Sequence, residues 1–188
     1  MSNFALPLAA QAQQQPDGDW APAVGHAVRA WIGLGANLGD RGEAMQQALA
    51  QLATTPGVAV ERVSSLYASK PVDSDGPDYL NAVAQLVTRL PAHALLLVLQ
   101  QLEQAAGRER PYRNAPRTLD LDLLLYASRE TVVSLPDLQV PHPRMWQRAF
   151  VLSPLQELQP AWVSDALLQP LLAQGVARAE GPAWALPV

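Results

Sequence analysis

Two aspartates lie inside the otherwise apolar stretch of residues 116–126, which reads PRTLDLDLLLY. Because side chains alternate across a β-strand, Asp120 and Asp122 would project from one face and the intervening leucines from the other. Their Cα atoms would then lie about 6.5–7 Å apart, close enough for both carboxylates to bind a shared pair of divalent cations. Burial of an unpartnered charge is unfavourable. This strand therefore has to fold beside a metal site or a cluster of basic side chains.

Four arginines precede the aspartates, in a stretch rich in turn-forming residues: Arg108, Arg110, Arg113 and Arg117. Guanidinium groups bind phosphate oxygens and paired carboxylates bind magnesium, so the combination favours phosphoryl transfer. The structural alternative is that the arginines and aspartates form ion pairs with each other. Aspartate is disfavoured in strands, and arginines in a turn-rich segment can fold over a ligand. The sequence therefore favours the metal site.

The composition is that of a globular protein, with 188 residues, 49% apolar residues and 16% charged residues. The formal net charge of −4 gives the molecule no general attraction for nucleic acid or for anionic membranes. The sequence contains no cysteine, which excludes disulfides and thiolate metal sites, and a cytoplasmic location is expected. No apolar run reaches the length of a membrane span.

Residues 1–28 are rich in Gln, Pro and Gly and are predicted to form a disordered tail. Residues 29–188 are predicted to form one domain, of which residues 161–188 are a C-terminal extension. Apolar periodicity predicts the ferredoxin-like order β-α-β-β-α-β, an α+β fold whose antiparallel sheet has helices packed on one side. The predicted strands cover residues 29–35, 58–68, 79–90 and 116–126, and the predicted helices cover residues 40–55 and 91–106.

A resemblance to a known family rests on five separated blocks: Gly35–Asp40, Pro77–Ala82, Gly107-Arg108, Pro116–Asp122 and Val140–Met145. Together they resemble the 6-hydroxymethyl-7,8-dihydropterin pyrophosphokinases of tetrahydrofolate biosynthesis. The resemblance covers roughly residues 29–160, in the family's order and approximate spacing. It implies transfer of pyrophosphate from ATP to the hydroxymethyl group of the reduced pterin, with release of AMP.

The resemblance also implies roles for individual residues. Asp120 and Asp122 would hold two magnesium ions, and Arg108 and Arg117 would complete the catalytic set by clamping the phosphates. No dedicated protein base is evident, so positioning and electrostatic stabilisation are expected to carry most of the rate. The implied pterin-binding residues are Ser69, Val72, Tyr79, Asn81 and Phe150, and the implied ATP-binding residues are Gln100, Glu103, Arg108, Arg110, Arg117, His142, Arg144 and Arg148.

Strand geometry agrees with one part of this set. Tyr79 and Asn81 are two residues apart, so they share a strand face, and an amide can pair with the edge of a pterin ring. Without the resemblance, Phe150 would be interpreted as a core aromatic, His142 as a turn residue and Arg148 as a surface residue.

One block departs from the family pattern. Many members carry Trp-Gly before the Pro-Arg of the aspartate block, whereas this chain has Asn114-Ala115. The apolar cover that the tryptophan gives the pterin is therefore absent at this position. The hypothesis is that the site is sealed less tightly here, or that Tyr112 supplies the aromatic surface.

Three alternative functions remain open from the sequence. Another two-metal phosphoryl transferase would explain the aspartates and arginines but not Tyr79, Asn81 and Phe150. A ferredoxin-like nucleic-acid-binding module is disfavoured by the acidic net charge and by the lack of aromatics interleaved with the basic residues. An inactive scaffold is disfavoured by the retained aspartates and arginines. The expected partners are small-molecule substrates, with no nucleic acid and no membrane, and the expected state is a monomer.

Overall fold

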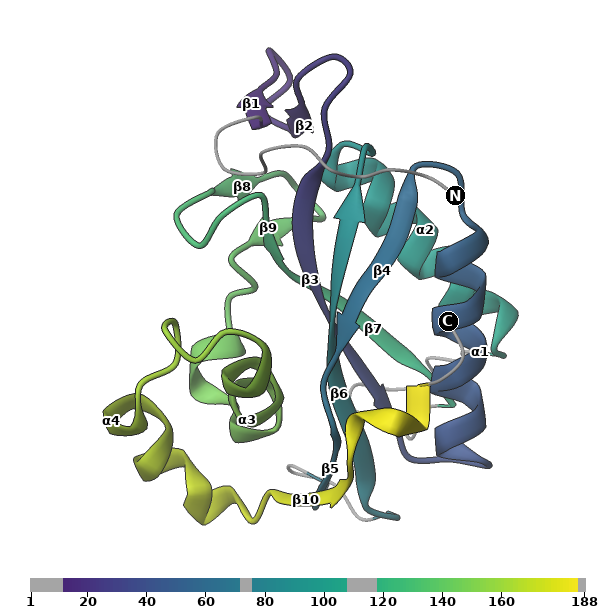
Figure 1. Cartoon of the computed structure of the whole chain (residues 1–188), viewed down its shortest axis with the longest axis vertical. Helices are drawn as coiled ribbons and strands as arrows, with labels where there is room; N and C mark the ends of the chain where they lie inside the picture. Colours follow the sequence, from purple (N-terminus) through teal and green to yellow (C-terminus); the bar gives the residue numbers. More distant parts are fainter. Residues whose placement is uncertain (1–11, 72–75, 108–117, 186–188) are drawn as a thin grey trace.

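The computed structural model describes residues 12–71, 76–107 and 118–185. At its centre is a six-stranded antiparallel sheet in the order β10-β5-β6-β3-β7, with β4 also paired to β6 (Figure 1). Strand β3 therefore lies between β6 and the edge strand β7. The strands are β3 (Val28–Ala36), β4 (Val58–Val63), β5 (Leu66–Ser69), β6 (Tyr79–Thr88), β7 (Asp120–Tyr126) and β10 (Ala177–Glu180).

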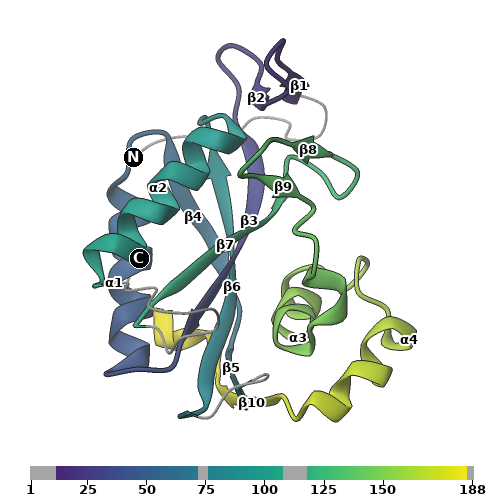
Figure 2. The same cartoon turned by 180° about the vertical axis from the view of Figure 1, so that it is seen from behind.

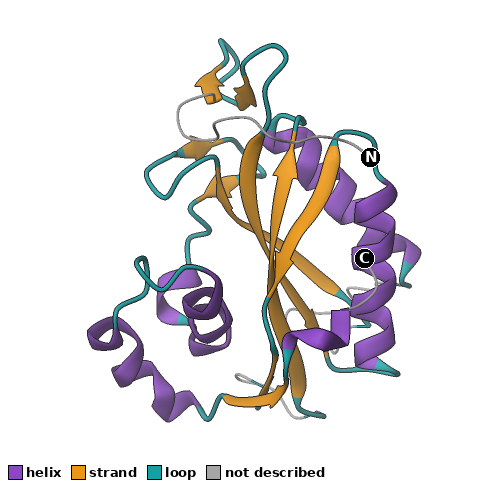
Figure 3. Ribbon diagram, in the orientation of Figure 1, coloured by secondary structure: helices purple, strands orange, loops and turns teal. Residues whose placement is uncertain are grey.

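Two helices, α1 (Arg41–Thr54) and α2 (Ala92–Ala105), cover one face of this sheet. Asp40 caps α1 as its spacing to Glu43 predicts, because its side chain accepts a hydrogen bond from the Glu43 N–H at 2.9 Å. Glycine ends α2, since Gly107 has a φ of 76° that other residues rarely adopt. The predicted β-α-β-β-α-β order is confirmed, and the sheet lies between layers of helix (Figure 3).

The opposite face of the sheet is covered by α3 (Ala149–Leu158), so the prediction that helices pack on one side only is wrong. Apolar side chains of α3, including Leu152 and Leu155, pack against Trp31 of β3 and Val83 of β6. The bulky Trp31 projects away from α1 and α2, and its burial requires a second layer. We call this side of the sheet the α3 face. Its residues are Trp31, Gly33 and Gly35 of β3, Tyr79, Asn81 and Val83 of β6, and Asp120 and Asp122 of β7.

The predicted strand over residues 58–68 is in fact two strands, β4 and β5, separated at Ser64 and Ser65. The Ser64 side chain accepts a hydrogen bond from the Val83 N–H at 3.0 Å, and its own N–H donates to the Val83 carbonyl at 2.9 Å. The serine thus satisfies the backbone of β6 at the break. As a result, β4 and β5 pair with different parts of the same long strand.

Strand β7 contains a bulge that accounts for its run of three leucines. Its register shifts where Trp31 and Ile32 of β3 pair with Leu125 and Leu123. The extra residue, Leu124, allows Leu124 and Leu125 both to face α3, whereas Tyr126 returns to the α1 and α2 side. Both faces of this strand are therefore filled with apolar side chains beyond the aspartates.

The N-terminal segment is not disordered from residue 12 onward, in contrast to the sequence prediction. It forms a hairpin of β1 (Ala12–Gln14) and β2 (Trp20–Pro22), visible at the upper end of the sheet in Figure 1. Trp20 packs against the main core, and the buried Asp19 carboxylate accepts hydrogen bonds from the His93 N–H at 3.2 and 3.3 Å. His93 lies in the first turn of α2, which begins after a proline that offers no capping side chain. Asp19 therefore caps α2 from a distant part of the chain.

We expect Asp19→Ala to lower the free energy of unfolding by about 1 kcal/mol, because it removes a helix cap. Urea denaturation followed by circular dichroism measures this change. Asp19→Asn keeps an acceptor oxygen and serves as the matched control, with a smaller loss expected. Equal unfolding midpoints for wild type and Asp19→Ala would show that the hairpin does not stabilise α2.

An ion pair fastens β3 to β4 at the edge of the α3 layer. Arg29 donates to Glu61 through Nε at 2.7 Å and Nη2 at 2.8 Å, and Gln85 donates to the same carboxylate at 2.5 Å. The Arg29 guanidinium, helped by Gln85, holds the pKa of Glu61 below its usual range. Because the folded-state pKa is lowered, this stabilisation is present above the unfolded-state value of about 4.3 and is lost at lower pH.

We therefore expect Glu61→Gln to destabilise the protein at pH 7 by about 1 kcal/mol or less, since the pair is partly exposed and screened. The difference from wild type should shrink as the pH falls below about 4.3. Urea unfolding midpoints at pH 7 and pH 3.5 test this. A difference that persists unchanged at the lower pH would exclude ionisation of Glu61 as its cause.

The last part of the chain wraps around the edge of the sheet. It runs from the α3 side through α4 (Asp165–Leu168) and η2 (Gln169–Gln174), adds β10 beside β5, and ends against α1 in η3 (Pro182–Ala185), a path also visible from behind in Figure 2. Trp184 is buried there and donates its indole N–H to the Ser64 carbonyl at 2.9 Å. The remaining described elements are β8 (Val133–Ser134), β9 (Gln139–Val140) and η1 (Met145–Gln147). None of the described helices is both long and apolar enough to cross a membrane.

Candidate active site

The two aspartates of β7 project from the same face of the sheet, as the sequence predicts, and this is the α3 face. Their partners on β3 are glycines, because Asp120 pairs with Gly35 and Asp122 with Gly33. Directly opposite residues in a sheet share a face, so each carboxylate lies beside a position without a side chain. Gly33 and Gly35 are both partly exposed, and a Cβ atom added at Gly33 would lie 3.6 Å from the Leu124 side chain.

Gly35 separates Asp120 from Asn81. In register, Asp120, Gly35 and Asn81 follow one another across β7, β3 and β6, which places Asp120 and Asn81 about 10 Å apart at Cα. A Cβ atom added at Gly35 would lie 3.6 Å from Asn81 Oδ1 and 4.0 Å from Asp120 Cβ. We call Gly33 and Gly35 the glycine strip. At Gly35 the strip places no side chain between the Asn81 amide and Asp120.

The amide of Asn81 is held in a fixed orientation. Its Nδ2 group donates to Ser69 Oγ at 2.9 Å and to the Tyr67 carbonyl at 3.2 Å, which directs Oδ1 toward the glycine strip. Ser69 and Asn81, both predicted to contact the pterin, are thus in direct contact with each other. Tyr79 precedes Asn81 on the same face and pairs with Ser69 across the strands, so three of the predicted pterin residues lie together.

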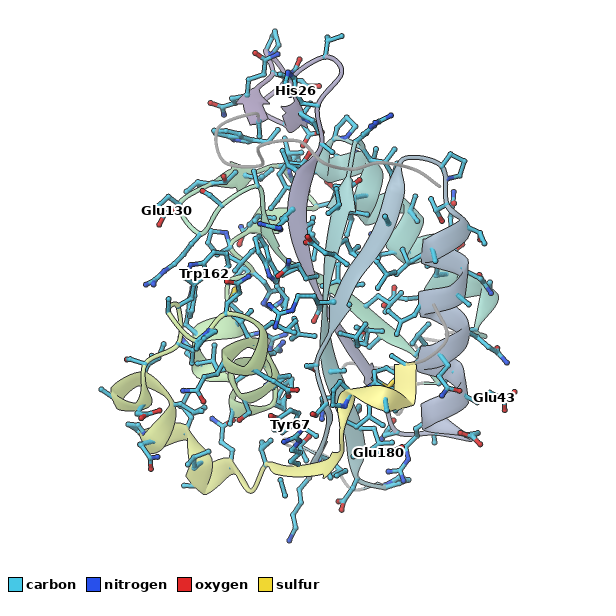
Figure 4. All side chains as sticks on the ribbon, in the orientation of Figure 1. His26, Glu43, Tyr67, Glu130, Trp162 and Glu180 are labelled. Carbon is cyan, nitrogen blue, oxygen red and sulfur yellow. The ribbon has the colours of Figure 1, made fainter. Side chains whose placement is uncertain are left out.

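Three residues next to this group were not predicted as site residues from the sequence. The Tyr67 hydroxyl donates to Glu157 Oε2 at 3.2 Å, and Ser65 donates to the same carboxylate through its N–H at 3.1 Å and its Oγ at 2.9 Å. Burial, reinforced by the Glu157 charge, raises the pKa of Tyr67 and keeps its hydroxyl protonated. Figure 4 shows Tyr67 between the sheet and α3. The sequence signal for this contact was a glutamate in a largely apolar helix, because a buried carboxylate needs hydrogen-bond donors.

A basic group lies on the other side of the aspartates. Arg148 Nη1 is 3.8 Å from Asp122 Oδ2, and His142 Nε2 is 3.9 Å from the same oxygen. Burial lowers the pKa of His142, although Asp122 acts in the opposite direction. His142 Nδ1 accepts a hydrogen bond from the Arg144 N–H at 3.2 Å, so the neutral ring presents an Nε2–H toward Asp122. The structure thus brings His142 and Arg148 to the carboxylate that the sequence assigned to metal.

Arg148 also connects this group to Phe150. The guanidinium carbon of Arg148 lies 5.4 Å from the centroid of the Phe150 ring, within the range of a cation–π contact. Both residues lie at the start of α3, and Phe150 is only partly buried. Arg144 is exposed on the preceding turn. A partly exposed ring beside the α3 face is available to stack on a ligand, which a fully buried core aromatic is not.

Two predicted ATP contacts lie elsewhere. Glu103 on α2 is only 2% exposed, and its Oε1 accepts a hydrogen bond from the Leu121 N–H at 2.7 Å. This bond supports β7 between the two aspartates, and the contact of Glu103 with ATP stays a prediction. Gln100, one turn earlier on α2, is half-buried, and no hydrogen bond joins its side chain to another described residue. The predictions for the following residues lie outside the described part of the chain: Val72, Arg108, Arg110, Tyr112, Arg113, Asn114-Ala115 and Arg117.

The donor set on the α3 face suits a hard cation. Asp120 and Asp122 contribute carboxylate oxygens from one face, and Asp122 keeps 39% of its side chain exposed. Within residues 12–71, 76–107 and 118–185, no group of three or more His, Cys, Asp or Glu side chains is arranged to hold a metal. Two carboxylates, with the remaining positions filled by water and phosphate oxygens, are the usual protein contribution to a magnesium–nucleotide site.

Comparisons with known proteins give one consistent result. Residues 31–160 match the model of the family described as 7,8-dihydro-6-hydroxymethylpterin-pyrophosphokinase. A Synechocystis protein named 2-amino-4-hydroxy-6-hydroxymethyldihydropteridine pyrophosphokinase is 43% identical over 132 residues, which are 70% of this chain and 67% of the relative. A Bacillus subtilis protein of the same name is 45% identical over 130 residues, 69% of this chain and 77% of the relative.

A solved structure shares the fold. A Plasmodium falciparum HPPK-DHPS chain, crystallised with SDX-DHP, superposes with a TM-score of 0.53 and 13% sequence identity. The match covers 78% of this chain and 44% of the Plasmodium chain. At this identity the likeness concerns the arrangement of strands and helices and not the site.

Proposed function

Because this chain belongs to the 7,8-dihydro-6-hydroxymethylpterin-pyrophosphokinase family, we infer that it is an ATP-dependent diphosphotransferase of folate biosynthesis. It transfers pyrophosphate from ATP to the hydroxymethyl group of 6-hydroxymethyl-7,8-dihydropterin. In this reaction the substrate hydroxyl oxygen bonds to the β-phosphorus, the bond between that phosphorus and the α-phosphate oxygen breaks, and AMP leaves. The hydroxyl proton passes to water.

The observation that best supports this function is the row of Asp120, Gly35 and Asn81 across the α3 face. Asn81 lies on one side of the glycine strip, and the paired aspartates lie on the other. A pterin has a polar ring edge that suits a fixed amide, and a phosphate chain needs charge-neutralising groups. The strip therefore joins the place for the pterin ring to the place for the phosphates.

We propose that Asn81, Ser69, Tyr79 and Phe150 bind the pterin. The amide orients the ring edge, and the two aromatic residues supply apolar surface on which it stacks. Val72 is proposed to belong to the same set. Orientation of the hydroxymethyl group toward the aspartates gives the advantage of proximity, which is the largest contribution that a rigid site makes to such a transfer.

We propose that Asp120 and Asp122 hold two magnesium ions, which when bound neutralise charge on the phosphates of ATP. Arg148 and His142 lie beside Asp122 and are placed to donate hydrogen bonds to phosphate oxygens. Arg144, Arg108, Arg110 and Arg117 are proposed to add positive charge around the same phosphates, with Arg108 and Arg117 acting in the transfer itself. Gln100 remains a proposed nucleotide contact. The protein is proposed to act as a cytoplasmic monomer.

Incubation of the protein with Mg-ATP and 6-hydroxymethyl-7,8-dihydropterin, followed by nucleotide chromatography, tests the function. AMP that forms only when the pterin is present is the expected product. Formation of ADP would mean attack on the γ-phosphorus and would exclude pyrophosphoryl transfer. Absence of any nucleotide turnover with intact magnesium binding would indicate a binding protein without activity.

A further inference from the structure

The side chain of Gln174 forms two hydrogen bonds with the backbone at the start of α3. Its Nε2 group donates to the Gln147 carbonyl at 2.9 Å, and its Oε1 accepts from the Ala149 N–H at 2.9 Å. Gln174 is the last residue of η2, and Gly175 follows it with a φ of 70°. A single amide thus bonds the two residues on either side of Arg148.

The segment that Gln174 bonds is residues 147–149, the junction at which η1 ends and α3 begins. Arg148 is the C-cap residue of η1 and the N-cap residue of α3. The first N–H groups of a helix lack partners within the helix, and Gln174 satisfies that of Ala149. Among the described residues, no other side chain bonds the Gln147 carbonyl or the Ala149 N–H. Gln174 therefore fixes the backbone on both sides of Arg148.

The side chains of Arg148 and Phe150 extend from this junction, and both lie at the candidate active site. Arg148 reaches to 3.8 Å from Asp122 Oδ2, and its guanidinium also lies 5.4 Å from the centre of the Phe150 ring. A rotation of the junction would move both groups together, because they are separated by one buried residue, Ala149. Errors of about 1 Å in the position of a substrate-contacting group are enough to lower the rate strongly.

Gln174 also lies outside residues 31–160, the part of the chain that matches the family model. In the segment after α3, Leu168 of α4 is buried and Leu171 of η2 packs against the same core, whereas Gln174 is exposed. The exposed amide of Gln174 can form its hydrogen bonds with water instead of with the protein. Its paired contacts to the junction are thus specific.

We propose that Gln174 is a positioning residue for pyrophosphoryl transfer, holding Arg148 beside Asp122 and Phe150 beside the glycine strip. The proposal rests on the proposed function. It predicts that loss of the amide lowers turnover of the pterin without preventing folding. The residue acts through Arg148 and Phe150 and does not itself contact substrate.

The test is steady-state kinetics of AMP formation with Gln174→Met, which keeps the side-chain length but removes both hydrogen bonds. We expect kcat/KM for the pterin to fall about tenfold, which lies within the range expected for loss of two hydrogen bonds. Gln174→Glu keeps the acceptor for the Ala149 N–H and should fall between Gln174→Met and wild type. Gln169→Ala is the matched control, because Gln169 starts the same η2 segment, is exposed and makes no side-chain hydrogen bond to a described residue.

Urea unfolding of the same variants separates positioning from stability. A Gln174→Met variant that unfolds at lower urea but has wild-type kcat/KM under native conditions would reduce Gln174 to a structural residue and overturn the proposal. If that variant does not fold, wild-type kinetics of Gln174→Glu together with those of Gln169→Ala would overturn it as well. A wild-type enzyme that forms no AMP would instead refute the proposed function, on which the assignment depends.

Discussion

Replacement of both Asp120 and Asp122 by asparagine is expected to abolish pterin-dependent AMP formation, with a loss of at least about 10³-fold in kcat/KM. Asparagine preserves the shape of each side chain but removes the two negative charges that face the glycine strip. Metal-ion stabilisation of a phosphoryl-transfer transition state contributes several kcal/mol, and each 1.4 kcal/mol corresponds to a tenfold change in rate. Chromatography of the nucleotides measures the loss of activity, and calorimetric titration with Mg²⁺ measures the loss of metal binding.

The size of this effect distinguishes a functional pair from structural ion pairs. A partly exposed ion pair contributes about 1 kcal/mol or less to stability, so its loss cannot account for a thousandfold fall in activity. Asp165→Asn, at an exposed position on α4, is the matched control and should retain wild-type rates. If the double variant loses stability in proportion to activity, the aspartates support the fold and the metal assignment is wrong.

Gly35→Val is expected to lower kcat/KM for the pterin by about 10²-fold or more, because its methyl groups would occupy the strip between Asp120 and Asn81. A Cβ at this position meets only ordinary contacts of 3.6 and 4.0 Å, and valine is favoured in strands. The sheet should therefore form, and the loss should come from displacement of the substrate. Initial rates at varied pterin concentration, with isothermal titration for binding, measure the effect.

A glycine elsewhere in the chain provides the comparison. Gly42 lies in the first turn of α1, and a Cβ there would lie 3.7 Å from Asp40 Oδ1. Gly42→Ala should leave AMP formation unchanged, since alanine is well accommodated in a helix. Wild-type binding of the pterin by Gly35→Val would mean that the ring does not lie over the glycine strip.

The sequence was most informative where a local rule acts. Alternation along a strand correctly predicted that Asp120 and Asp122 share a face, and that Tyr79 and Asn81 do so too. The capping contact of Asp40 also followed from spacing within a few residues. These features depend on neighbours in the sequence, so they can be recognised without knowledge of the rest of the fold.

The sequence was least informative where distant segments meet. Three contacts join residues that no periodicity connects. Asp19 caps α2, Gln174 bonds the backbone at the start of α3, and Glu103 bonds β7. The second helical layer was missed for the same reason, since nothing local shows that α3 covers the opposite face. The break between β4 and β5 depends on Val83, far along the chain.

The path of the last residues has a consequence for any shortened version of this protein. Family similarity ends at residue 160, yet β10 shields the outer edge of β5, and Trp184 fills the space beneath α1. Truncation at the limit of similarity would leave an unpaired strand edge beside an uncovered apolar surface. Such edges recruit strands from other molecules, so the trimmed protein would be prone to self-association. The segment that matches the family is therefore shorter than the segment needed to cover the sheet edge and the core.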